Sequence, residues 1–207
     1  MGRGHGGSRG GGASREVSLD YLGSLYESSK GDTKTLLEAA GYTGKPQLVD
    51  EIDTSKAWEG VTMHRGVQTE EFAKQLKEGN MHYGGGKGVN GGQSQINALG
   101  DGIYAYAGGD AKAMTKMYGK TRVDMALSKS AKVADYGTLK SELLAKGVKQ
   151  SDITSKISAY AISKGYHAIH QNKGSLHSQG SGKDNVGVFG KSDIVVVLDR
   201  RKLMIKK

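Results

Sequence analysis

Glycine is distributed in this chain in a way that limits what the chain can fold into. The 207 residues include 33 glycines, roughly twice the usual share, against a single proline. Three glycine-rich stretches stand out, at residues 1–13, 79–102 and 172–185. Because glycine weakens helices and strands, these stretches favour loops, and the apolar segments between them must supply the core.

Residues 1–13 are almost all Gly, Ser and Arg, and they cannot bury enough apolar surface to become ordered. We therefore expect a flexible basic tail, either a solvated arm or a contact with nucleic acid or a neighbouring subunit. Residues 14–207 are of the right length for a single domain, with a helical N-terminal part over residues 14–45.

The composition excludes several classes of protein. The chain contains no cysteine, which excludes disulfides and thiolate sites. It has no apolar run of about 18 residues, so no spanning helix is expected, and its N-terminus lacks the apolar stretch of a secretory signal. A formal net charge of +9 favours anionic partners.

The hydrophobic pattern predicts helices and strands in irregular order. Helices are expected over 14–40 with a break at Gly31 and Asp32, and over 69–77, 136–146 and 151–164; strands are expected over 61–67, 102–107, 122–127, 166–170, 186–189 and 194–198. The last two would form a hairpin, with residues 203–205 extending it. This mixture predicts an α+β fold with a mostly antiparallel or split sheet and flanking helices.

Common site motifs are missing from the sequence. There is no P-loop, no G-x-S-x-G elbow and no H-E-x-x-H zinc motif. The histidines do not show metal-ligand spacing, and His167 and His170, three apart on a strand, should point to opposite faces. We therefore expect no metal.

Three separate segments carry the more informative pattern. The first is a strand that ends in Arg65 and Gly66, which would present a planar guanidinium beside an accessible backbone. The second is the G-x-G-I-Y run that ends at Tyr104, with Tyr118 on a following helix. The third is the valine-rich strand that begins near Asp193.

In this order the segments resemble the ADP-ribosyltransferase fold. Poly(ADP-ribose) polymerases carry a similar G-x-G-I-Y run, and phage-encoded ADP-ribosyltransferase-like proteins are more similar still. The latter place a G-x-x-G-K-P piece before the Arg-Gly strand, as residues 41–46 do here. They also carry strands like 122–127 and 165–169 and a terminal V-V-L-[ND]-R strand like 196–200. The resemblance covers about residues 36–207 and implies a split, mostly antiparallel sheet.

The resemblance implies NAD⁺ as substrate and a role for each of four residues. Arg65 would bind a phosphate or the adjacent ribose, and the Gly66 backbone would pair with the nicotinamide amide. Tyr104 would stack on nicotinamide, and Tyr118 would pack the same site. The structural alternatives are a surface salt bridge for Arg65, a strand-end turn for Gly66, a core tyrosine for Tyr104 and helix–sheet packing for Tyr118.

The catalytic acid departs from the family pattern. Family members usually carry a glutamate at the start of the last strand, where this chain has Asp193, one methylene shorter. Either Asp193 serves, or Gln171 or Gln179 binds without activating, or the site is weak; a solvated turn residue is the structural alternative. The Ser-Thr-Ser start that arginine-specific transferases carry on the second strand is also missing.

Two functions follow as expectations. The first is a phage-encoded mono-ADP-ribosyltransferase that transfers ADP-ribose from NAD⁺ to a protein or nucleic-acid acceptor. The second is a catalytically weak or inactive protein of the same fold in a phage virion, near the head or portal, contacting DNA through its basic tail. A nucleic-acid-binding module that works through its charge is a third, weaker alternative. Either of the first two would be found in the virion or the host cytoplasm, without a membrane partner.

Overall fold

The structure is a computed structural model that describes residues 17–80, 99–108, 119–172 and 193–207. Several features expected from the sequence lie outside these ranges. They are the basic tail over 1–13, most of the glycine-rich segment after residue 80, Tyr118, Gln179 and the strand over 186–189.

The described helices begin and end at the residue types that normally cap helices. The helices are α1 (Leu19–Ser28), α2 (Thr33–Ala39), α3 (Glu70–Glu78), α5 (Tyr136–Ala145) and α6 (Ile153–Ser163). Asp32 accepts from the Thr35 N–H at 2.8 Å at the start of α2, and Thr69 accepts from the Phe72 N–H at 3.3 Å at the start of α3. Gly79, in the left-handed conformation, ends α3. The predicted break at Gly31 and Asp32 is confirmed.

The strands form one mixed sheet. They are β1 (Gln47–Val49), β2 (Met63–Val67), β3 (Ile103–Ala107), β4 (Thr121–Leu127), β5 (Val133–Asp135), β6 (Ala168–Gln171), β7 (Asp193–Val197) and β8 (Leu203–Lys206). Their order in the sheet is β1-β8-β4-β2-β3-β7-β6-β5. Only the outermost described pairs, β1 with β8 and β5 with β6, are parallel. The predicted α+β class with a mostly antiparallel sheet is confirmed.

Short 3₁₀ helices lie in the connections: η1 (Thr54–Lys56), η2 (Trp58–Gly60), η3 (Gln150–Asp152) and η5 (Arg200–Lys202). Across the part of the chain that the structure describes, no helix combines the length and apolarity that a membrane crossing needs.

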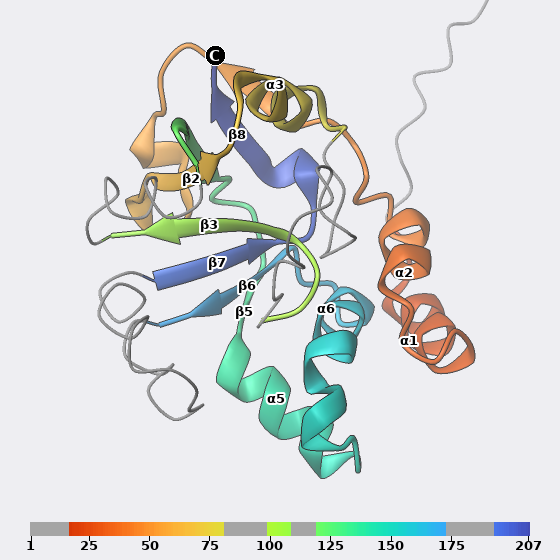
Figure 1. Ribbon diagram of the computed structural model, residues 1–207. Coiled ribbons are helices and arrows are strands. Elements are labelled where there is room, and N and C mark those ends of the chain that lie inside the picture. Colours follow the sequence, from red (N-terminus) through yellow and green to blue (C-terminus); the bar gives the residue numbers. More distant parts are fainter. Residues whose placement is uncertain (1–16, 81–98, 109–118, 173–192) are drawn as a thin grey trace, which may run out of the picture.

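The two faces of the sheet are covered unequally. Helices α1, α2, α5 and α6 pack on one face, where Tyr106, Val196 and Ile169 join their side chains in a large apolar core. Helix α3 contributes Ala73 and Leu76 to a second core on the opposite face. Helix α3 packs on β2 and β4, and Figure 1 shows it well apart from the other four helices. We call these the four-helix face and the α3 face.

Two expectations about the C-terminal strands are wrong. Strand β7 has β3 on one side and β6 on the other, so it is a central strand and not half of a terminal hairpin. Residues 203–205 do not extend that strand either, since they belong to β8, which pairs with β4 and β1. The turn of η5 redirects the chain between β7 and β8 and separates the two strands across the sheet (Figure 1).

The sheet is narrowest in its middle. Strands β2 and β4 pair over five positions, and β3 and β7 also pair over five, but β2 and β3 pair only at Met63 with Ala107 and at His64 with Tyr106. Beyond His64 the two strands separate, so two halves of the sheet meet at a short junction. Arg65 is the first residue of β2 beyond that junction.

Candidate functional site

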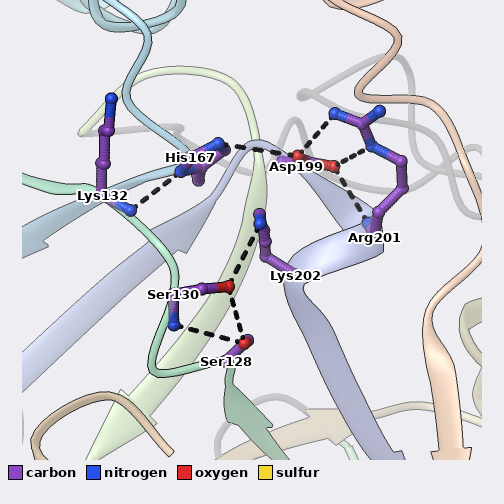
Figure 2. A network of polar contacts seen from close by, with 7 residues as sticks. All are labelled: Ser128, Ser130, Lys132, His167, Asp199, Arg201 and Lys202. Carbon is purple, nitrogen blue, oxygen red and sulfur yellow. Dashed lines mark hydrogen bonds and ion pairs between the residues drawn. The ribbon is translucent and has the colours of Figure 1, made fainter. Parts of the chain in front are cut away.

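The segment after β7 holds a fully buried carboxylate. The Asp199 side chain is 0% exposed. Its Oδ1 accepts from the Arg201 backbone N–H at 3.0 Å and from Nε at 2.9 Å, and its Oδ2 accepts from Nη2 at 2.9 Å. Figure 2 shows the guanidinium turned back onto this carboxylate. Charge-assisted bonds of this kind satisfy the buried charge and fix the turn that leads into β8.

The G-x-x-G piece before β2 packs on the same arginine. The Arg201 guanidinium carbon lies 5.5 Å from the centre of the Tyr42 ring, within cation–π range. A Cβ added to Gly44 would lie 2.6 Å from the Arg201 Cγ, so only glycine permits this approach. Residues 41–46 and 196–200 also meet directly, since the Arg200 N–H donates to the Tyr42 carbonyl at 3.1 Å.

The G-x-G-I-Y run is held together by its own contacts. A Cβ on Gly100 would lie 2.4 Å from the Ser158 Oγ of α6, and one on Gly102 would lie 2.3 Å from a methyl group of Val196 on β7. The Tyr104 hydroxyl donates to the Gly100 carbonyl at 2.7 Å and accepts from the Leu99 N–H at 3.0 Å. Burial raises the pKa of the Tyr104 phenol, which stays protonated as these bonds require.

Arg65 and Tyr104 meet, but not through the aromatic ring. The Arg65 Nη1 donates to the Tyr104 backbone carbonyl at 2.6 Å, across the gap where β2 and β3 separate. The Tyr104 ring packs against the core of the four-helix face. Arg65 lies between Met63 and Val67, whose side chains belong to the core of the α3 face, so strand alternation places Arg65 on that face. Gly66 is buried and pairs with Arg122 of β4.

Asp193 lies at the start of β7 and contacts a histidine of the neighbouring strand. Its Oδ2 is 3.3 Å from the Nε2 of His170, and the two side chains are 29% and 13% exposed. Trp58 meets the His170 ring edge to face, with the ring centres 5.0 Å apart. Sequence reasoning assigned His170 no function, and only the pairing of β6 with β7 reveals its partner.

Arg65, His170 and Asp193 share the α3 face of the sheet. Val195 and Val197, which alternate with Asp193 in the same direction, belong to the core of this face, as do Ala105 and Ala107 of the intervening strand β3. Since neighbouring strands lie about 4.8 Å apart, Arg65 on β2 and Asp193 on β7 are offset by about 10 Å across the sheet. Small alanine side chains lie between them.

The opposite face carries a second polar group on β2 and β4. The His64 Nδ1 lies 2.8 Å from the Asp124 Oδ1, and the Arg122 Nη2 donates to the Asp124 Oδ2 at 2.9 Å. Partial burial acts to raise the pKa of the Asp124 carboxyl, but the bonds from Arg122 and His64 outweigh it and hold the pKa below its usual range. This carboxylate is therefore ionised and serves to orient the histidine.

Among residues 17–80, 99–108, 119–172 and 193–207, no three metal-ligating side chains are grouped to hold an ion. A comparison of the chain with protein-family models, with curated proteins and with solved structures found no match. The candidate site consequently rests on the geometry of Arg65, His170 and Asp193.

Proposed function

We propose that this protein is a mono-ADP-ribosyltransferase, which cleaves NAD⁺ and transfers ADP-ribose to a protein or nucleic-acid acceptor. The observation that carries the proposal is the placement of Arg65 and Asp193 on one face of the sheet, on either side of strand β3. A fixed cation and a carboxylate on one face of the sheet suit a substrate that has a pyrophosphate at one end and a developing cation at the other.

The proposed reaction breaks one bond and forms one. The glycosidic bond between nicotinamide and the ribose C1′ breaks, and its electron pair leaves with nicotinamide, which becomes neutral. The acceptor forms a new bond to C1′ and loses a proton to solvent. Because the ribose passes through an oxocarbenium-like state, a nearby carboxylate lowers the barrier by stabilising positive charge. Asp193 is assigned this role, together with binding of the ribose 2′-hydroxyl.

Arg65 is assigned the role of binding the phosphates of NAD⁺. Its guanidinium is permanently charged, and the bond from Nη1 to the Tyr104 carbonyl fixes its direction. In this proposal Tyr104 supports the site through its carbonyl, and through the hydroxyl bonds that hold residues 99–104 in place. Stacking of the Tyr104 ring on nicotinamide forms no part of this proposal, because the ring packs against the core of the four-helix face, opposite Arg65 and Asp193. Pairing of the Gly66 backbone with the nicotinamide amide stays a prediction.

His170 is assigned a positioning role. Its Nε2 lies beside the Asp193 Oδ2, and Trp58 limits the rotation of its ring. An aspartate is shorter than the glutamate of the related family and has less reach, so its direction matters more. A carboxylate misplaced by about 1 Å can cost about 100-fold in rate.

The test is nicotinamide release from NAD⁺, measured by chromatography with an arginine-rich protein, duplex DNA or water as acceptor. We expect turnover in the intact chain and a loss of at least about 100-fold in Arg65→Ala, since the phosphates would no longer be positioned. Arg122→Ala is the matched control, because this arginine belongs to the neighbouring strand but contacts Asp124 on the other face. We expect the control to retain its activity.

A second variant tests whether Arg65→Ala loses activity only because it fails to fold. Arg65→Lys keeps the charge but loses the planar fork, so it should fold and still turn over more slowly than the intact chain. Circular dichroism of each variant verifies folding. If the folded chain consumes no NAD⁺ with any of these acceptors, the enzymatic proposal is wrong.

A second candidate is a structural protein of a phage virion that retains this fold with a weak or inactive site. The observation that favours it is the structural contact between two family-like segments, in which the Arg200 N–H donates to the Tyr42 carbonyl, together with the shorter acid at position 193. This candidate predicts many copies of the chain in purified particles, which quantitative mass spectrometry measures. Particles without the chain would rule it out.

A further inference from the structure

The connection between β4 and β5 is a tight turn that the rest of the chain holds in place. The Ala131 N–H donates to the Ser128 carbonyl at 2.9 Å, and the hydroxyls of Ser128 and Ser130 lie 3.1 Å apart. Two further bonds anchor the turn, from the Ser128 N–H to the Lys202 carbonyl at 2.7 Å and from the Lys129 N–H to the Lys56 carbonyl at 2.8 Å. The hydroxyl groups are thus held at the surface in a fixed arrangement.

The turn carries two lysines and contacts a third. Lys202 donates from Nζ to the Ser130 Oγ at 3.1 Å, while Lys129 and Lys132 belong to the turn itself and are exposed. Figure 2 shows Lys202 beside Ser130 and the Lys132 side chain pointing away from the two serines. Within the described part of the chain, none of the three forms an ion pair with a carboxylate. The carboxylate of Asp199 lies nearby but is buried and accepts three bonds from Arg201.

A neighbouring histidine also experiences this positive charge. The His167 Nδ1 accepts from the Lys132 N–H at 2.8 Å. Burial lowers the pKa of the imidazole, and the charges of Lys202 and Lys132 lower it further, against the opposing charge of Asp199. The turn thus carries the charges of Lys129 and Lys132 beside that of Lys202, while the nearby carboxylate of Asp199 is buried.

We propose that the 128–132 turn, together with Lys202, binds phosphates of a nucleic-acid backbone. Hydroxyl and ammonium groups both donate hydrogen bonds to phosphate oxygens. A lysine ammonium binds a phosphate as a point charge, whereas the planar guanidinium of an arginine is the group that binds a carboxylate with two parallel bonds. An exposed turn binds a single small anion weakly against water, whereas a polyanion releases counterions at each phosphate that a lysine neutralises. The proposal uses neither Arg65 nor Asp193, so it does not rest on the proposed enzymatic function.

The experiment measures binding of the full chain to a fluorescent DNA duplex by anisotropy at several salt concentrations. We expect the variant with Lys129→Gln, Lys132→Gln and Lys202→Gln to bind more weakly and to lose about 2.7 from the slope of log K against log salt, about 0.9 per phosphate contact. The matched control carries the same three changes at Lys140 in α5, Lys149 directly before η3 and Lys156 in α6. We expect its slope to match that of the intact chain.

Ser130→Ala distinguishes binding at this turn from binding through the net positive charge of the protein. It removes the hydroxyl that holds Lys202 but changes no charge, so affinity should fall about fivefold, the equivalent of one hydrogen bond, with an unchanged slope. An equal loss of slope in both triple variants would overturn the proposal, because general charge would then explain binding. Binding of inorganic phosphate that requires the three lysines, with an unchanged DNA slope, would overturn the nucleic-acid assignment in favour of a small anion.

Discussion

Two aspartates lie at the two ends of the segment that contains β7, and they differ in almost every physical respect. Asp193 at the start of the strand has a 29% exposed side chain and a histidine as its neighbour. Asp199, just past the strand's end, has a 0% exposed side chain and accepts three bonds from Arg201. The first carboxylate is partly open to solvent, and the second is bound into the fold.

The difference shows how a residue type acquires its role. A carboxylate that is fully buried must be paired, and once paired it stabilises a single local arrangement. A partly exposed carboxylate contributes less to stability, because solvent screens its interaction with its partner. The same reasoning separates Arg201, which is used by the fold, from Arg65, which lies at the junction of β2 and β3.

The largest expected effect comes from removing the partner side chain of each aspartate. Arg201→Ala leaves the buried Asp199 charge without its partner and should cost about 3–5 kcal/mol of unfolding free energy. His170→Gln leaves Asp193 partly solvated and should cost about 1 kcal/mol or less. Urea denaturation of both variants measures the two costs. Equal costs would show that the two aspartates do not differ as described here.

A smaller effect is expected where glycine contacts Arg201. Gly44→Ala places a Cβ at 2.6 Å from the Arg201 Cγ and should cost about 1–3 kcal/mol through overpacking. Gly23→Ala in α1 is the control, since nothing lies within 4 Å of its added Cβ. That change should stabilise the protein by about 0.5–1 kcal/mol because alanine favours helix. Thermal unfolding should therefore shift in opposite directions, and a stabilised Gly44→Ala would contradict the packing role of this glycine.

The smallest expected effect concerns pH near Asp199. Burial lowers the folded-state pKa of His167 below its ordinary value of 6.5, so the unfolded chain binds more protons there. Its contribution to stability is present above pH 6.5 and is lost as the pH falls from there through the lower folded-state pKa. His167→Asn should keep an acceptor for the Lys132 N–H without titrating. Stability measured between pH 7.5 and 5.5 should fall less in this variant than in the intact chain, by less than about 1 kcal/mol; equal falls would exclude this role of His167.

Several parts of the fold could be predicted from local patterns. The caps at Asp32 and Thr69, the end of α3 at Gly79 and the strand at 103–107 all follow from residues a few positions apart. The prediction of a terminal hairpin was wrong, because the local pattern of a valine-rich strand is the same whether its partner strand in the sheet is adjacent in sequence or far away.

The candidate site was only partly accessible to such reasoning. Arg65 and Asp193 could be proposed from strand ends and from the family resemblance, but His170 could not, since its partner lies on another strand. The Tyr104 ring was expected beside Arg65, yet strand alternation turns it to the four-helix face while its carbonyl stays with the guanidinium. The alternation of side chains along a strand can be read from neighbouring residues. Which helices cover each face of the sheet cannot, because it depends on residues far apart in sequence.

Sequence alone was sufficient for the helix ends, the alternating strands, the α+β class and the excess of positive charge. Each depends on composition or on neighbours within one or two turns of chain. Burial of one aspartate and exposure of the other depended instead on β7 lying between β3 and β6. Those pairings join residues that are distant in sequence, and they are set by the combined packing of two cores, which no short stretch of residues encodes.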